Sequence, residues 1–348
     1  MRKSVVWSIL AVSLAVIIAG YILLKGSGAN RSNITIVISP YQDLAMLVNL
    51  EGLNLEKKYG TMVQIKTIPW EETYTTLLSA SHPADMGFSS FADYLTKAQN
   101  VNKGSDDPLL FIYPAYIFKG GAFVSFKPDM IAITEQTLND PETLKKFLSR
   151  RLGFQKDTLY QMIIYHLADQ AGINPESIKF VDVGFDAGLL GAQAGDIDAA
   201  AVGLTQLTEA QKRGGRVVLD MNSLKLADVT GFIARKSVVE QKRDHVANVI
   251  RMWFDCVDFV FTDLDKNSAN SLAYLEKHAA TKYTLQSYKA ALSQEYFPRS
   301  IRELNKELLS PTGMYPIENI YTVIIQYLRI QGVISESMDK PQFLNIAG

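Results

Sequence analysis

One pattern occurs twice in this chain: a short helix, an aspartate-led apolar strand too short to be exposed, and a second helix. It reads LLSASHPADMGFSSFADYLTKAQ at residues 77–99 and AQAGDIDAAAVGLTQLTEAQ at residues 192–211. In an open α/β sheet such a βαβ step brings a loop to the carboxyl edge of the strands, where ligands bind. The two copies therefore predict two ligand-facing loops, one at Ser89 and Ser90 and one from Gly203 to Thr205.

Strands alternate with helices around both copies, which predicts an α/β fold with mostly parallel sheets flanked by helices. Strand-like runs at 109–113, 122–126 and 230–237 interrupt this rhythm. We interpret them as crossings between two lobes that enclose a cleft with a hinge. From residue 240 onward the pattern is almost wholly helical.

The length of the chain also favours two lobes, because 348 residues exceed what one compact core usually holds. The predicted division has three parts. Residues 1–32 form a membrane anchor or signal segment with a linker, residues 33–119 plus 231–348 form lobe 1, and residues 120–230 form lobe 2.

Two helices are expected in particular detail. Residues 43–60 are predicted as one amphipathic helix that begins at the N-cap Asp43 and ends at Gly60. The helix that follows Thr158 carries a predicted buried stripe and ends at Gly172. The stripe consists of Leu159, Met162, Ile163, His166, Leu167 and Ala171.

The first residues carry a strong membrane signal. Residues 5–24 are uncharged and apolar, a length that matches the hydrocarbon thickness of a bilayer. Arg2 and Lys3 precede this segment, so the positive-inside rule predicts a transmembrane helix with the body of the protein outside the cytoplasm. A retained anchor is favoured over a cleaved signal peptide, although the small residues that end at Ala29 resemble a cleavage site.

Composition excludes several classes of protein. The formal net charge of -1 provides no basic excess for a nucleic acid. Cys256 is the only cysteine, so the chain can form no intramolecular disulfide and no cysteine-rich metal site. We expect Cys256 to act as a small buried hydrophobe, and we expect no metal and no cofactor.

The candidate ligand-binding residues follow from the expected cleft loops. They are Tyr41, Gln42, Trp70, Ser89, Ser90, Lys156, Asp157, Thr158, Asp186, Gly203 and Thr205.

Each candidate also has a structural interpretation. Tyr41 and Trp70 can stack on a flat or alkyl ligand, or Trp70 can simply pack at the rim. Asp157 and Thr158 begin a helix whose amides can bind an anion, or they only cap it. Lys156 can add a positive charge, whereas Asp186, like Asp43, suits an amine or caps a helix. The charge of the ligand therefore stays open.

The sequence resembles the solute-binding proteins of ABC importers in the group that takes nitrate, sulfonates, taurine and thiamine-precursor pyrimidines, the SsuA/THI5-like group. The resemblance depends on SPYQDLAMLVNLEGLNLEKKYG, on ADMGFSS and on GDIDAAAVGLTQLTEAQKRGG, in that order. It implies the two-lobed fold of type II periplasmic binding proteins, a small-molecule ligand and an ABC permease as partner. It also implies a periplasmic or extracytoplasmic location at the inner membrane.

The sequence departs from that group at two places. His82, Pro83 and Ala84 stand where a glycine often precedes the acidic residue of the first lobe. Residues 155–158 stand where small glycine and serine residues are common in the second lobe. These positions usually face the ligand, so the ligands of the group are not carried over to this chain.

The resulting prediction is the substrate-binding component of an ABC importer, without enzymatic activity. One alternative is an enzyme on the same fold, such as a pyrimidine synthase or a menaquinone-pathway lyase, because a fold alone does not fix function. Against it, the chain has no phosphate-binding, zinc-protease or nucleophile-elbow motif, and its four histidines lie in separate segments. A second alternative is a membrane-tethered ligand sensor.

Overall fold

The computed structural model describes residues 33–81, 83–221, 223–224, 226–279, 282–330, 332, 334 and 340–346. The predicted transmembrane segment lies outside these residues, and so does His82. Among the helices that the structure describes, none has both the length and the apolar character needed to cross a bilayer.

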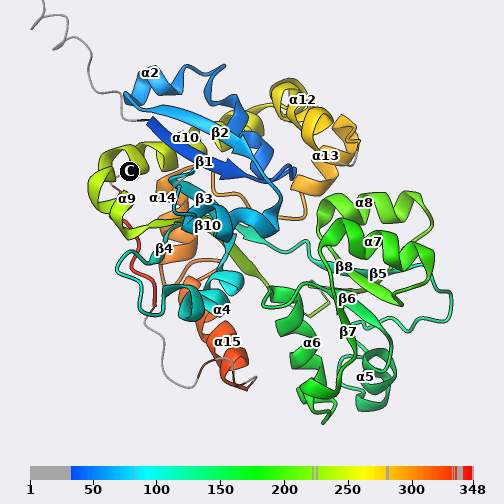
Figure 1. Cartoon of the computed structure of the whole chain (residues 1–348). Coiled ribbons are helices and arrows are strands. Elements are labelled where there is room, and N and C mark those ends of the chain that lie inside the picture. Colours follow the sequence, from blue (N-terminus) through cyan, green and yellow to red (C-terminus); the bar gives the residue numbers. More distant parts are fainter. Residues whose placement is uncertain are drawn as a thin grey trace, which may run out of the picture.

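Two five-stranded sheets organise the molecule, and Figure 1 shows them in separate parts that we call lobe 1 and lobe 2. Sheet 1 has the order β2-β1-β3-β10-β4, and sheet 2 has the order β7-β6-β8-β5-β9. The strands of sheet 1 are β1 (Asn33–Ile38), β2 (Met62–Thr67), β3 (Met86–Ser90), β4 (Leu109–Phe118) and β10 (Asp228–Arg235). Those of sheet 2 are β5 (Ala122–Ser125), β6 (Leu152–Phe154), β7 (Phe180–Asp182), β8 (Ala199–Val202) and β9 (Arg216–Asp220).

Helices flank both sheets. Those before the first crossing are η1 (Leu44–Leu50), α2 (Leu55–Tyr59), η2 (Trp70–Glu72), α3 (Thr73–Leu78) and α4 (Phe91–Asn102). Those of lobe 2 are α5 (Pro141–Leu148), α6 (Leu159–Gln170), η3 (Pro175–Ser177), α7 (Phe185–Ala194) and α8 (Leu204–Lys212). The C-terminal helices are α9 (Lys236–Gln241), α10 (Arg243–Thr262), α11 (Leu264–Asn267), α12 (Ala269–His278), α13 (Leu285–Leu292), α14 (Ile301–Leu304), η4 (Asn305–Leu309) and α15 (Ile317–Ile330).

The predicted α/β architecture with mostly parallel sheets is confirmed, because four of the five strands in each sheet run in one direction and a single strand is reversed. Strands β1, β2 and β3 run parallel to one another, as do β6, β7 and β8. Strands β5 and β10 run antiparallel to both of their neighbours. Each of these two strands arrives directly from the other sheet, without the helical crossover that a parallel connection needs, and so enters in the opposite direction.

The helix predicted over residues 43–60 is in fact two short helices, η1 and α2. Asn54 has a φ of 54°, in the left-handed region, which breaks the helical path between them. The predicted ends are correct. The Asp43 side chain accepts a hydrogen bond from the Leu44 amide, and Gly60, with a φ of 65°, ends α2.

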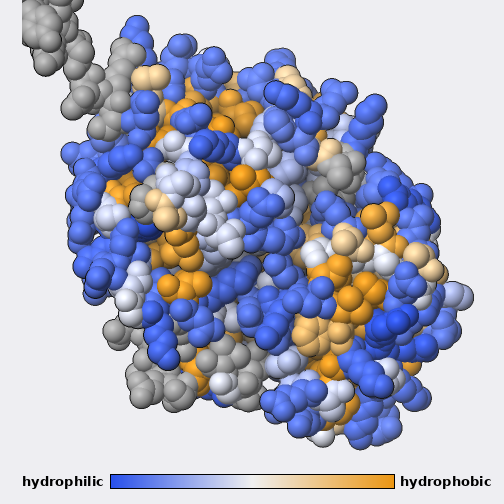
Figure 2. Space-filling view, in the orientation of Figure 1, coloured by the Kyte–Doolittle hydropathy of each residue, from blue (hydrophilic) through white to orange (hydrophobic). Residues whose placement is uncertain are grey.

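Aromatic side chains fill the core of lobe 1. The Trp253 ring of α10 lies 5.2 Å from that of Phe88 and 6.3 Å from that of Phe232, and all three side chains are buried. Cys256 is buried on the same helix, as predicted. Burial of such large rings contributes about 2 to 3 kcal/mol each and holds α10 against sheet 1. The face drawn in Figure 2 is mainly hydrophilic, with separate hydrophobic patches on both lobes.

The buried stripe predicted for α6 is confirmed except at one position. Leu159, Met162, Ile163, Leu167 and Ala171 are buried. His166 is only half-buried, and its ring lies 4.6 Å from that of Tyr327 in α15.

Candidate functional site

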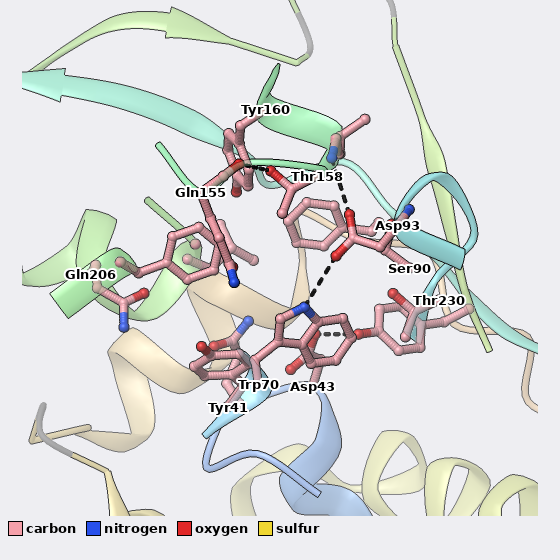
Figure 3. A pocket seen from close by; sticks show the side chains of 17 residues that line it. Tyr41, Asp43, Trp70, Ser90, Asp93, Gln155, Thr158, Tyr160, Gln206 and Thr230 are labelled. Atoms are coloured by element: carbon pink, nitrogen blue, oxygen red, sulfur yellow. Dashed lines mark hydrogen bonds between the residues drawn. The ribbon is translucent and has the colours of Figure 1, made fainter. Parts of the chain in front are cut away.

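A cavity of about 70 Å³ lies between the two lobes (Figure 3). The lining residues from lobe 1 are Tyr41, Gln42, Asp43, Trp70, Ser90, Asp93, Tyr116, Phe118 and Thr230. Those from lobe 2 are Gln155, Thr158, Leu159, Tyr160, Phe185, Gly203, Leu204 and Gln206.

The carboxyl ends of the parallel strands supply much of this lining. In lobe 1, Tyr41 follows β1, Trp70 follows β2 and Ser90 ends β3. In lobe 2, residue 155 follows β6, residue 185 follows β7 and residue 203 follows β8. The site therefore lies where α/β sheets bind ligands, at the carboxyl edge of the strands, and both sheets contribute to it.

The Asp93 side chain of α4 bridges the two lobes. Its Oδ1 accepts a hydrogen bond from the Leu159 amide at 3.0 Å, at the start of α6 in lobe 2. Its Oδ2 accepts a longer bond from Trp70 Nε1 at 3.4 Å, and the Lys97 ammonium lies 3.9 Å from the same oxygen. Figure 3 shows the carboxylate between Trp70 and the start of α6. A carboxylate of lobe 1 thus caps a helix of lobe 2.

Two further carboxyl groups lie at helix starts in lobe 1. Asp43 Oδ1 accepts from the Leu44 amide at 3.0 Å, and its Oδ2 accepts from the Tyr116 hydroxyl. Burial raises the pKa of Asp43, because desolvation disfavours the charged form.

Asp228, at the start of β10, caps helix α4. Its Oδ1 accepts from the Ala92 amide of α4 at 3.2 Å, and its Oδ2 bonds with the Ser90 hydroxyl. Complete burial, with the Asp93 carboxylate nearby, raises the pKa of Asp228 to about 7.

Aromatic rings form the remaining walls. The Tyr41 ring lies 6.3 Å from that of Trp70 and 6.5 Å from that of Phe185. The Tyr160 ring meets that of Phe185 edge-on at 5.3 Å, and its hydroxyl donates to the Val202 carbonyl at 2.9 Å. Such walls favour a ligand with an apolar or aromatic body.

The structure brings several of the predicted site residues together. Six of them line the cavity: Tyr41, Gln42, Trp70, Ser90, Thr158 and Gly203. Asp186 lines an adjoining cavity of about 360 Å³ that Tyr41 and Phe185 share. Thr205 lies in the first turn of α8.

The structure places three predicted residues away from the lining. Ser89 and Ser90 are neighbours in a strand, so their side chains point to opposite faces and only Ser90 faces the cavity. The Ser89 hydroxyl bonds instead with that of Tyr74 at 2.7 Å and donates to the Ser90 carbonyl. The Lys156 side chain is exposed. Asp157 has a φ of 58°, and its amide donates to Gln161 Oε1 at 2.7 Å.

The start of α6 also differs from both interpretations of the sequence. Thr158 makes no side-chain cap, and its hydroxyl donates to the Gln155 carbonyl at 2.6 Å. The cap comes instead from Asp93, so the free amide that we expected for an anion is already bonded.

Several lining residues were not among the predicted ones. Asp93 and Gln206 lie in the first turns of α4 and α8, directly after the predicted loops. These two residues could have been added to the predicted site, because the first helical turn after a strand end also lies at the ligand-binding edge of the sheet. Tyr116 and Phe118 belong to a crossing strand, where nothing in the sequence pattern indicates which side faces the cleft. Across the described residues no group of three or more histidine, cysteine, aspartate or glutamate side chains could hold a metal ion.

Sequence comparison identifies two similarities. The family model NMT1/THI5 like matches residues 126–263. A protein of Brachyspira hyodysenteriae, assigned as an ABC transporter periplasmic binding protein, is 20% identical over 281 residues, which is 78% of each chain.

Solved structures show the same fold at low identity. The alkanesulfonate-binding protein SsuA from Xanthomonas axonopodis pv. citri, bound to MOPS, aligns with a TM-score of 0.63 and 14% identity over 89% of this chain and 96% of its own. The periplasmic nitrate-binding protein NrtA from Synechocystis PCC 6803 aligns with a TM-score of 0.57 and 14% identity over 88% and 92% of the two chains. The protein therefore has the fold of periplasmic binding proteins, contains a region that matches the NMT1/THI5-like family, and is similar in sequence to an ABC transporter periplasmic binding protein.

Proposed function

We propose that this protein is the substrate-binding component of an ABC importer, which captures a small solute between its lobes and presents it to a permease. The observation that carries the proposal is the cavity itself. Strand ends of both sheets line it together, with Trp70 from lobe 1 and Phe185 from lobe 2 among the lining residues. A solute held there contacts both lobes at once and stabilises the closed arrangement through these differential contacts.

The comparisons support a binding role over an enzymatic one. The Brachyspira relative is assigned as an ABC transporter periplasmic binding protein, and the two aligned structures are of proteins that bind alkanesulfonate and nitrate. The cavity in turn presents aromatic walls and capped carboxyl groups rather than a paired nucleophile and base. The proposal accordingly includes no catalytic step and no cofactor.

The remaining parts of the proposal concern organisation. The division follows the sequence prediction, with residues 33–119 plus 231–348 in lobe 1 and residues 120–230 in lobe 2, except that residues 228–230 join lobe 1, and the hinges lie at the two chain crossings. All of β10 belongs to sheet 1, so the return hinge precedes Asp228. Residues 1–32 hold the body at the outer side of the cytoplasmic membrane, where the permease is met. The contact residues of the solute are those predicted residues that line the cavity.

A solute screen tests the binding role. Thermal unfolding is recorded with small amines, pyrimidines, nitrate and sulfonates, each at several concentrations. A solute at 100 times its Kd stabilises the folded state by about 2.7 kcal/mol, so a true ligand raises the Tm by a few degrees in a saturable way. The substitution Trp70→Ala should abolish this rise, whereas Tyr165→Ala, in the half-buried part of α6, should preserve it.

Small-angle scattering then tests the closure. The ligand found in the screen should reduce the radius of gyration with the same concentration dependence as the rise in Tm. A tight ligand that leaves the molecular dimensions unchanged, or that still binds normally to Trp70→Ala, contradicts capture between the lobes.

A further inference from the structure

Three helix N-termini near the cleft carry carboxylates of the protein itself. Asp43 accepts from the first amide of η1, Asp228 from the Ala92 amide of α4, and Asp93 from the Leu159 amide of α6. A helix N-terminus binds anions because its amides are unpaired and its dipole is positive there. At these three positions an anionic solute would have to displace a carboxylate, whereas α7 and α8 begin at Gly184 and Gly203 without a side-chain cap.

The cavity lining offers an anion no positive charge in exchange. The described lining residues include no lysine, arginine or histidine. The Lys97 ammonium near the cavity lies 3.9 Å from Asp93 Oδ2 and neutralises that carboxylate. A sulfonate or nitrate would therefore find no cationic side chain in the lining and would lie close to the Asp43 carboxyl group, which is unfavourable at the short distances of a closed cleft.

An acceptor without a partner points into the same cavity. Gln206 is 3% exposed, and its Oε1 has no hydrogen-bond partner in the described part of the chain. Its Nε2 donates to Asp186 Oδ1 at 2.8 Å, which fixes the orientation of the amide. Figure 3 shows the oxygen on the cavity side of the side chain. A buried acceptor left unpaired is destabilising, and a donor on the ligand removes that penalty.

A second unpaired acceptor lies behind the cavity wall. Glu295 is buried, and neither of its carboxyl oxygens has a hydrogen-bond partner among the described residues. Burial, together with the nearby Asp43, raises the pKa of Glu295 well above its ordinary value, and Lys119 opposes this shift. A raised pKa favours the neutral carboxyl group, so Glu295 brings no further fixed negative charge to the cleft.

We infer that the cavity takes a small organic cation: an ammonium group on a compact apolar or aromatic body. The ammonium donates to Gln206 Oε1, within the field of Asp43, and the body lies between the rings of Tyr41, Trp70 and Phe185. Aromatic faces attract such cations, because the face of each ring carries partial negative charge. This inference rests on the proposed solute-binding function and names the class of its ligand.

Three probes of matched shape test the inference: benzylammonium, benzyl alcohol and benzylsulfonate, titrated calorimetrically into the full chain at constant ionic strength. Benzylammonium should bind at least 10-fold more tightly than either of the others. Gln206→Met should reduce the affinity for benzylammonium about 10-fold. Gln211→Met, an exposed glutamine of the same helix, should leave it unchanged. The comparison of the three probes on the unaltered chain does not depend on the folding of any variant.

The other outcomes overturn the inference. Preference for benzylsulfonate, equal binding of all three probes, or no binding of benzylammonium each contradicts a cation site. In those cases the solute-binding function still stands if the wider screen finds a ligand that compacts the molecule, and it fails separately if no solute does so.

Discussion

The two copies of the helix–strand–helix pattern have the same layout, but their turns at the cleft differ. In α3–β3–α4 the second helix begins at Ser90, whose hydroxyl accepts from the Asp93 amide at 3.1 Å and bonds with Asp228. In α7–β8–α8 the second helix begins at Gly203 without a side-chain cap. The first turn is thus fully bonded, whereas the second has the unpaired acceptor Gln206 Oε1.

This difference separates two tasks that a closing cleft must perform. The turn of the first copy carries Asp93, which reaches the other lobe and holds the closed arrangement. The turn of the second copy offers an acceptor that nothing in the described residues satisfies, so it is the part that a solute completes. Under the proposed function the first copy serves closure and the second serves recognition.

The largest expected effect is the pH dependence of the unfolding free energy that Asp228 causes at the turn of the first copy. The pKa of Asp228 is about 7 in the folded protein, above its ordinary value, so the folded state keeps a proton that the unfolded state loses. Its contribution to stability is therefore fully present below about pH 4 and is lost as the pH rises to about 7. At about 1.4 kcal/mol per unit of pKa shift, the loss is up to about 4 kcal/mol.

The substitution Asp228→Asn should remove this dependence, because an amide does not titrate. Urea unfolding at pH 4.0, 5.5 and 7.0, as chosen test points, measures the slope of the unfolding free energy for both proteins. Asp169→Asn, an exposed position of α6, is the matched control and should keep the slope of the unaltered chain. If Asp228→Asn has the same slope as the unaltered chain, the Asp228 carboxyl group does not titrate in this range.

The next effect concerns the bridge between the lobes. Asp93→Ala leaves the Leu159 amide and Trp70 Nε1 without their acceptor, which should reduce the unfolding free energy by about 2 to 3 kcal/mol. Because the lobes lose their direct bond, the radius of gyration without ligand should also increase in small-angle scattering. Asp169→Ala is the control for removal of a carboxylate. If Asp93→Ala has the dimensions of this control, closure does not depend on the bridge.

Local sequence signals were sufficient for much of the fold. The strand of the second copy lies at 199–202, directly after Asp198, where the repeated pattern predicts an aspartate-led apolar strand. Gly195 ends α7 with a φ of 87°. The rule that parallel strands present their carboxyl ends to a ligand then located six of the lining residues without any knowledge of packing.

Contacts between distant segments could not be predicted in this way. Asp93 and Leu159 are 66 positions apart, and Ser90 and Asp228 are 138 positions apart. Neither pair is visible in a local pattern, because each depends on how the lobes meet. The antiparallel direction of β5 and β10 was missed for the same reason, since it follows from where the chain crosses rather than from the residues of the strands.

The smallest effect sharpens the comparison within the second copy. Gly195 has a φ of 87°, and a Cβ added there meets no atom within 4 Å, so Gly195→Ala tests backbone strain alone. It should lower the unfolding free energy by about 1 kcal/mol. Gly203 has a φ of −81°, and an added Cβ would lie 3.4 Å from Gln206 Oε1, an ordinary contact. Gly203→Ala should therefore change stability by only a few tenths of a kcal/mol. Urea unfolding measures the loss of unfolding free energy for both variants. Equal losses would show that the backbone at Gly203 is under more strain than its φ indicates.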